Sequence, residues 1–164
     1  MKKFILLFIL IPSISLAASM SMIGEKGKLS EVDRVIEVKM YDNFYEPNEI
    51  KIKKGETIKF KVHNFGELVH EFNIATKKMH LKHQPEMNKL VENEILLGDK
   101  IDKKKMKEMA KKDHSMSHSH TNSVLLEPNE SGEIIWKFNT AAKLEAACNI
   151  PGHYETGMIA KIKY

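Results

Sequence analysis

Hydrophobic and polar residues alternate in several short stretches of the chain. A two-residue period, with lysine on the polar side, is typical of a strand that buries one face. Strand-like stretches of this kind cover residues 34–40, 49–53, 57–62, 123–126, 133–138 and 158–164. Turns containing Gly and Pro separate them, which indicates an antiparallel sandwich or barrel. We expect an all-β fold, specifically a Greek-key β-sandwich.

The alternation stops between residues 76 and 122. This segment is rich in Lys, His and Met, and its apolar residues at 90, 91, 95 and 97 have spacings that suit a short amphipathic helix. Asp99 or Asp102 is the candidate N-cap for a second helix over residues 103–111. We therefore predict a partly helical or disordered insertion at about 76–122, inside one domain that spans residues 34–164.

The first 17 residues have the features of a secretory signal peptide. Lys2 and Lys3 precede an apolar run over residues 4–11, and Ser15-Leu16-Ala17 fits the small-residue cleavage rule. The run is too short to span a bilayer, so we expect cleavage after Ala17 and no membrane insertion of the mature chain. We predict a periplasmic protein with a flexible lead-in over residues 18–33.

Composition narrows the function classes. The chain has 164 residues, enough for one domain with a core, and a formal net charge of +4. Lysine and glutamate are interspersed without an arginine-rich cluster, so nucleic acid is not an expected partner. A single cysteine excludes an intramolecular disulfide. We expect a monomer.

One stretch near the C-terminus carries candidate metal ligands. Cys148, His153 and Met158 follow one another at five-residue spacing, with turn-forming Gly and Pro residues between them. A thiolate, an imidazole and a thioether suit copper, and His70 is the natural source of a second imidazole. The alternative is that Cys148 is an ordinary buried apolar residue. A lone thiol in an exported protein, however, calls for a specific role.

The spacing Cys148-x4-His153-x4-Met158 resembles the ligand loop of the cupredoxins, and is most similar to that of rusticyanin. Residues 44–66 also resemble the opening strands of bacterial cupredoxin domains. The resemblance implies a type 1 copper site, blue or green, whose ligands are His70, Cys148, His153 and Met158. It further implies similarity to small exported cupredoxins of bacterial copper-tolerance systems, which carry Met/His-rich segments.

The insertion supplies further candidate ligands. Three histidines and a methionine fall within residues 114–120, and imidazoles and thioethers bind Cu(II) and Cu(I) respectively. The alternative is a solvated loop whose methionines contact the sheet. The candidate secondary copper ligands are His80, His83, Met106, Met109, His114, Met116, His118 and His120.

Two functions remain open at this point. The first is copper handling that confers copper tolerance, with copper ions and a copper-handling protein as partners. The second is one-electron transfer between periplasmic redox partners, which has no use for extra ligands. We find no nucleophile–base arrangement, no paired carboxylates and no open coordination position, so we do not expect an enzyme.

Overall fold

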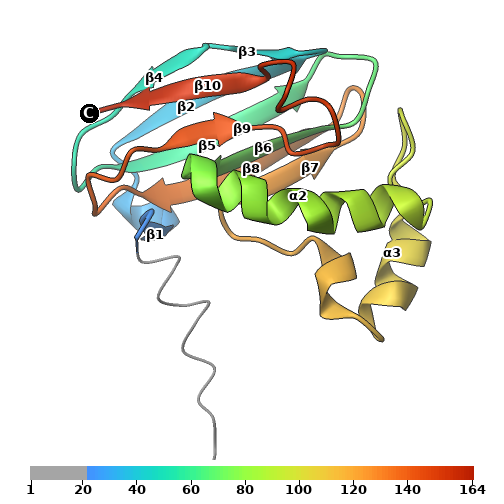
Figure 1. Ribbon diagram of the computed structural model, residues 1–164. Helices are drawn as coiled ribbons and strands as arrows, with labels where there is room; N and C mark the ends of the chain where they lie inside the picture. The colour runs from blue at the N-terminus through green and yellow to red at the C-terminus, as the bar shows by residue number, and fades with distance from the viewer. Residues whose placement is uncertain (1–21) are drawn as a thin grey trace, which may run out of the picture.

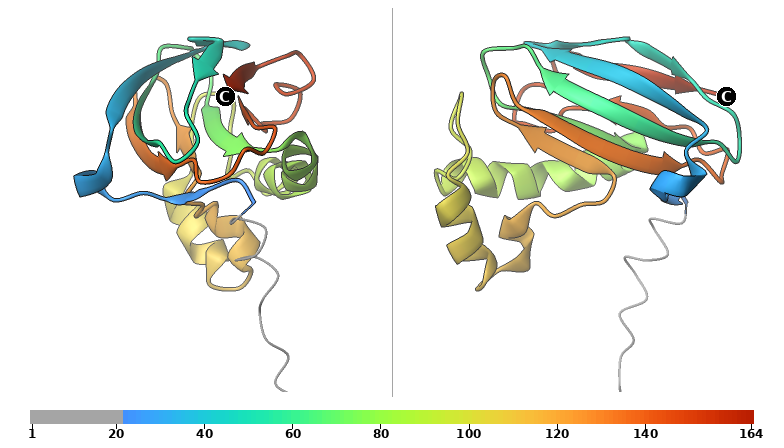
Figure 2. Two further views of the ribbon diagram at one scale, coloured as in Figure 1. Left: turned by 90° about the vertical axis from the view of Figure 1, so that its left-hand side faces the viewer. Right: turned by 180° about the vertical axis from the view of Figure 1, so that it is seen from behind.

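The computed structural model describes residues 22–164, which form two five-stranded sheets packed face to face (Figure 1, Figure 2). The first sheet has the order β1 (Glu25–Lys26), β8 (Ser131–Lys137), β5 (Thr57–Asn64), β2 (Arg34–Tyr41) and β3 (Phe44–Glu46). The second has the order β4 (Glu49–Lys51), β10 (Ile159–Lys163), β9 (Glu145–Ala147), β6 (His70–Ala75) and β7 (Ser123–Leu126). The predicted β-sandwich is confirmed.

Two strand pairs in this sandwich are parallel. β2 lies parallel to β5, and β10 lies parallel to β4, whereas the other neighbouring strands are antiparallel. Each parallel pair joins an early strand to a later one, so neither sheet is a simple run of hairpins. Segments far apart in the sequence are therefore brought together, as the metal-ligand candidates are.

Aromatic side chains from both sheets fill the space between them. Phe60 of β5 and Phe72 of β6 lie with ring centroids 5.5 Å apart, and Tyr45 meets Phe72 edge-on at 5.7 Å. Trp136 and Phe138 are also fully buried in this core. Each such side chain contributes roughly 2–3 kcal/mol by leaving water. The alternating pattern predicted inward positions for Phe60, Trp136 and Phe138, because a strand turns successive side chains to opposite faces.

The segment between β6 and β7 is largely helical. It contains α2 (Lys77–Glu92), α3 (Lys103–Ala110) and the 3₁₀ turn η2 (His114–Ser117). Helix α2 runs along the outer side of the second sheet, and α3 packs with η2 beyond its end (Figure 1). Of the two candidate caps, it is Asp102 that caps α3, by accepting a hydrogen bond from the Lys105 N–H at 2.8 Å.

The first helix of this segment lies earlier than predicted. The apolar residues at 90–97 suggested a helix there, but α2 ends at Glu92, and residues 96 and 101 instead form an isolated β-bridge. Thr76 starts α2 because its hydroxyl accepts the Met79 N–H. A second apolar cluster then anchors the segment, built from Val69, Met87, Leu90, Ile95, Leu96, Ile101 and Met116.

Part of the lead-in that we expected to be flexible is built into the fold. Glu25 and Lys26 pair with β8, Ile23 is fully buried, and the Trp136 indole N–H donates to the Ile23 carbonyl at 3.0 Å. The 3₁₀ turn η1 (Leu29–Glu31) follows. The predicted signal peptide lies outside the described residues. Within residues 22–164, no helix has the length and apolar character needed to cross a membrane.

Candidate metal centre

Strand β6 places two neighbouring residues on opposite faces of the second sheet. Phe72 and Ile74 point into the sandwich core, and His70 shares their phase, whereas Glu71 and Asn73 point the other way. All residues of β6 are buried because the core covers one face and the helical insertion covers the other. A single strand thus supplies side chains to two separate polar clusters.

His70 is held from behind by a carboxylate. Its Nε2 lies 2.8 Å from Asp42 Oδ1, while its Nδ1 is buried and has no hydrogen-bond partner among the described residues. The Asp42 carboxylate also accepts the backbone N–H groups of Glu67 and Leu68. This arrangement fixes Nε2 as the protonated nitrogen and leaves the Nδ1 lone pair available to a metal.

Gly66 is required beside this pair. A Cβ atom at this position would lie 2.9 Å from His70 Nε2 and would also collide with the Asp42 carboxylate. The loop between β5 and β6 can therefore approach the histidine closely only because residue 66 has no side chain.

The C-terminal loop brings the thiol and the second imidazole to the same place. Cys148 follows β9, and its Sγ accepts the Glu71 N–H at 3.3 Å and lies 3.4 Å from His153 Nδ1. The Cys148 N–H donates to the Met158 carbonyl, and the Met158 N–H donates to the His153 carbonyl. These backbone bonds close the loop and bring His153 to Cys148, and Met158 is fully buried in the core.

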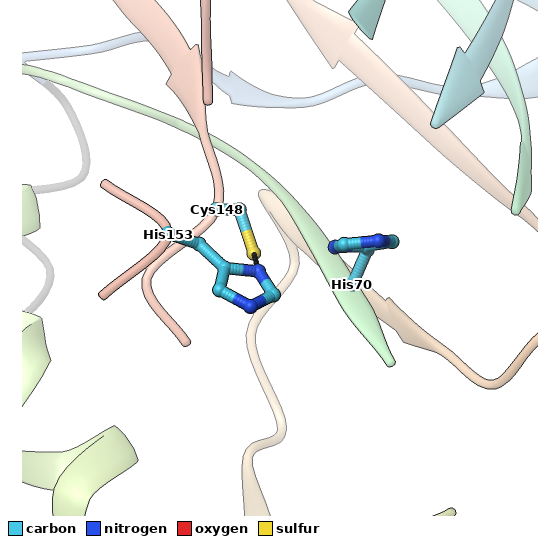
Figure 3. A group of neighbouring side chains, drawn as sticks. All are labelled: His70, Cys148 and His153. Carbon is cyan, nitrogen blue, oxygen red and sulfur yellow. Dashed lines mark hydrogen bonds between the residues drawn. The ribbon is translucent and has the colours of Figure 1, made fainter. Parts of the chain in front are cut away.

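Three of the predicted ligands converge, as Figure 3 shows. His70, Cys148 and His153 each offer one ligand atom, and these atoms lie within 4.8 Å of one another. Two ligands of one ion stand up to about 4.6 Å apart when the metal–ligand bonds measure 2.0–2.3 Å. His70 and Cys148 are fully buried, and His153 is partly exposed. The donors and the unpartnered His70 Nδ1 fit a soft metal ion.

Burial sets the protonation states of these groups. It raises the pKa of the Cys148 thiol to about 12 and lowers the pKa of both His70 and His153. The metal-free site therefore holds a thiol and two neutral imidazoles at neutral pH. A metal must displace the thiol proton, whereas the imidazoles are already in the form that binds it.

A second cluster lies on the other face of the same sheet. His83 of α2 and His118 and His120, which follow η2, offer ligand atoms within 4.8 Å of one another. The exposed fractions of the three side chains are 11%, 4% and 34%, so the cluster opens to solvent at His120. His118 adopts a left-handed backbone conformation, with φ of 43°, directly after η2.

Two carboxylates border this histidine cluster. Glu71 Oε1 lies 2.9 Å from His118 Nε2 and 3.3 Å from His83 Nε2, and the latter nitrogen is buried without a well-formed hydrogen bond. Glu86 contacts His83 Nδ1 at 3.1 Å and His120 Nε2 at 3.2 Å. An imidazole buried between two carboxylates occupies a place that suits a cation.

The pKa values reflect this charge pairing. Burial disfavours the ionised forms of Glu71, Glu86 and His83, but the hydrogen bonds between these carboxylates and the histidines of the cluster outweigh the effect of burial. Contact with His118 and His83 holds the pKa of Glu71 well below its usual range, and contact with His120 and His83 lowers the pKa of Glu86 to about 2. The same carboxylates raise the pKa of His83 to about 10.

The other candidate secondary ligands lie elsewhere. His80 is buried against Asn149 Oδ1 and the Glu145 carbonyl, and His114 is exposed and hydrogen-bonds the Ala110 carbonyl. Met116 is buried in the second apolar cluster, and Met106 and Met109 pack against it. These methionines therefore contact other apolar side chains. This is closer to the alternative interpretation, in which the methionines of the insertion pack against the rest of the protein, than to a role as copper ligands. We therefore do not carry His80, His114 and the three methionines forward as ligands.

Sequence reasoning missed Asp42, Glu71 and Asn149. Glu71 is next to His70 in a short strand that also carries Phe72 and Ile74, so an acidic residue there was a readable signal. Asn149 Nδ2 donates to Glu71 Oε2 at 2.7 Å, and its backbone N–H donates to the same oxygen at 3.2 Å. No local pattern distinguished Asp42 from other turn residues.

The fold and site together define a class: a two-sheet sandwich that carries a buried cysteine and two imidazoles where β2 ends and β6 begins. The sequence profile of the "Cupredoxin-like domain" family matches residues 7–99, which include His70 but end before the Cys148 loop. The chain belongs to this family.

Curated relatives match a larger share of the chain. The copper-resistant cuproprotein CopI of Pseudomonas aeruginosa is 40% identical over 153 residues, which cover 85% of this chain and 80% of the relative. CopI of Rubrivivax gelatinosus is 30% identical over 140 residues, which cover 85% of this chain and 71% of the relative.

Solved structures agree on the fold. The reduced auracyanin of Roseiflexus castenholzii superposes with a TM-score of 0.56 at 18% identity, covering 80% of this chain and 97% of that protein. Auracyanin B gives a TM-score of 0.59 at 12% identity, covering 85% and 94% respectively. At these identities the likeness concerns the fold alone.

Proposed function

We propose that this chain is an exported copper-binding protein that acts in copper tolerance through a type 1 centre. His70 and His153 supply neutral imidazole nitrogens, Cys148 supplies a thiolate, and Met158 supplies a weak axial thioether. The observation that carries the proposal is that His70, Cys148 and His153 offer ligand atoms within 4.8 Å of one another, together with the buried His70 Nδ1, which has no hydrogen-bond partner among residues 22–164. The name shared by the relatives, copper-resistant cuproprotein, supports copper as the metal and resistance as the role.

The structure suggests how the chain tunes this centre. The Glu71 N–H donates to the Cys148 sulfur, which withdraws electron density from the thiolate and favours the reduced metal. Asp42 holds the His70 ring, and the backbone bonds between residues 148 and 158 hold the loop. Copper supplies one-electron redox chemistry when it is bound, and these residues fix the ligands before it arrives.

Copper titration tests the type 1 assignment. Adding one equivalent of Cu(II) to the metal-free protein should produce an intense sulfur-to-copper charge-transfer band. Cys148→Ser should abolish this band, because a hydroxyl oxygen does not replace a soft thiolate. His114→Ala serves as the matched control, since this exposed histidine lies outside both clusters. A colourless Cu(II) complex of the unmodified protein would contradict the assignment.

We further propose that His83, His118 and His120 bind a second divalent copper ion. Three imidazoles with two adjacent carboxylates suit a borderline divalent ion, and His83 Nε2 is buried without a well-formed hydrogen bond. The protein should then bind a second equivalent without the thiolate band. His118→Ala should abolish binding of the second equivalent but leave the first, which gives the charge-transfer band at His70, Cys148 and His153 and is called the coloured centre below. His114→Ala should change the binding of neither equivalent.

The second cluster also separates copper handling from simple electron transfer. A one-electron carrier between periplasmic partners needs only the coloured centre, whereas a copper-handling protein gains capacity from the second. We expect a host that expresses the His118→Ala variant to tolerate less copper than one that expresses the unmodified protein at equal level. Equal tolerance would favour the electron carrier.

A further inference from the structure

Glu71 is shared by the two clusters, although they lie on opposite faces of the second sheet. Its backbone N–H donates to Cys148 Sγ at 3.3 Å, and its carboxylate, which is fully buried, lies 2.9 Å from His118 Nε2. One residue therefore contacts both the thiol of the coloured centre and an imidazole of the histidine cluster. Each contact is made directly, without an intervening side chain.

A second connection runs through the residue that follows the cysteine. Glu71 Oε2 accepts the Asn149 amide N–H at 2.7 Å and the Asn149 backbone N–H at 3.2 Å. The other oxygen accepts Ser123 Oγ at 2.6 Å and Asn73 Nδ2 at 3.0 Å. The carboxylate is thus hydrogen-bonded through both oxygens, and one of its partners, Asn149, directly follows Cys148 in the chain.

Glu86 provides a contrast on the same cluster. It contacts His83 and His120, as Glu71 contacts His83 and His118, but it has no hydrogen bond to the Cys148 loop. Glu86 lies at the more open side of the cluster, and 23% of its side chain is exposed. Glu71 therefore contacts both the histidine cluster and the Cys148 loop, whereas Glu86 contacts the histidine cluster only.

We propose that Glu71 couples the two metal sites, so that a divalent ion on the histidine cluster raises the reduction potential of the centre at Cys148. The proposal rests on the two sites proposed above. A dication on the histidine cluster adds positive charge beside Glu71, whose backbone N–H contacts the Cys148 sulfur, and this disfavours Cu(II) relative to Cu(I) at that sulfur. Binding free energies are reciprocal, so reduction of the coloured centre tightens divalent-ion binding on the histidine cluster by the same factor.

The expected size follows from ordinary site-to-site coupling. Coupled sites commonly change each other's affinity by about 5–150-fold, and the direct contacts of Glu71 justify an expectation of about tenfold. For a one-electron couple, a tenfold change corresponds to about 59 mV. Reduction of the centre should therefore strengthen divalent-ion binding about tenfold, and occupancy should raise the potential by about 60 mV.

Zinc is the probe, because Zn²⁺ has no redox chemistry and no visible spectrum. The protein is first loaded with one equivalent of copper at the coloured centre, and its potential is then measured by spectroscopic redox titration with and without Zn²⁺. We expect an upward shift with zinc in the unmodified protein, none in His118→Ala, and a much smaller one in Glu71→Gln. Glu86→Gln should weaken zinc binding but keep the shift at saturating zinc.

The outcomes separate this inference from the proposals beneath it. Absence of the coloured band before zinc is added refutes the type 1 centre, and absence of zinc binding refutes the second site. Zinc that binds at one equivalent without moving the potential overturns the coupling alone, as does a full shift in Glu71→Gln. If Glu71→Gln does not fold, zinc affinities of the Cu(I)- and Cu(II)-loaded unmodified protein decide, because equal affinities also overturn the coupling.

Discussion

Replacing Asp42 by Asn tests whether the carboxylate behind His70 prepares that histidine for a metal. Asp42 Oδ1 lies 2.8 Å from His70 Nε2 and also receives the N–H groups of Glu67 and Leu68. Asparagine keeps the size and one oxygen acceptor but removes the charge. The substitution therefore weakens the bond without emptying the space.

The magnitude follows from the kind of bond lost. A hydrogen bond to a charged group contributes about 1.5–3 kcal/mol and a neutral one about 0.5–1.5 kcal/mol, so the substitution should cost about 1–2 kcal/mol. This corresponds to a copper affinity roughly 5–30 times lower, which overlaps the range of about 10–100-fold typical of residues that orient a metal ligand. The charge-transfer band of the loaded protein should persist, since all four proposed ligands remain.

Competition with a chelator of known Cu(II) affinity measures the effect, with the charge-transfer band reporting the protein-bound copper. Asp33→Asn is the matched control, because Asp33 also caps a backbone N–H, that of Thr57 at 2.8 Å, but at the opposite end of β2. Urea unfolding of both metal-free variants separates stability from affinity. If both variants retain affinity within twofold of the unmodified protein, the orienting role of Asp42 is refuted.

Three further predictions concern the same centre. Because burial raises the pKa of Cys148 to about 12, the metal-free thiol is protonated at any pH well below 12. Copper binding at pH 8 should therefore release one proton, which a pH measurement in weak buffer detects, and Cys148→Ser should release none. Gly66→Ala should lower copper affinity and cost about 1–3 kcal/mol in unfolding free energy, because the new Cβ crowds His70, whereas Gly98→Ala, with Leu68 Cδ2 3.9 Å from its Cβ, should be nearly neutral. Met158→Leu should keep the charge-transfer band but raise the reduction potential, and an unchanged potential would argue against an axial role for the thioether.

Much of the architecture was readable from the sequence because it depends on local periodicity. The alternation in β5 set Ile58, Phe60 and Val62 inward, since side chains of a strand alternate whatever the strand pairs with. The Asp102 cap of α3 was predictable for the same reason, because a capping side chain bonds the backbone three residues later. The spacing of Cys148 and His153 likewise describes a short loop that closes on itself.

Only the tertiary structure decided which polar groups hydrogen-bond to the proposed ligands and to Glu71. Asp42 and His70 are 28 positions apart, Glu71 and His118 are 47 apart, and Glu71 and Asn149 are 78 apart. Such pairs depend on how the strands are ordered across the two sheets, and no repeat or turn signal encodes that order locally. The same holds for the insertion, where composition indicated metal ligands in general but the packing of α2 against η2 selected three histidines.

The methionines illustrate the physical reason most clearly. A thioether binds copper and also packs as an apolar side chain, so the sequence leaves both roles open for Met116. Its burial with Met87 and Leu90 follows from the path of the chain between α3 and β7. Sequence determined which side chains have metal-binding chemistry, and the fold determined which of them face a shared point and which face the core.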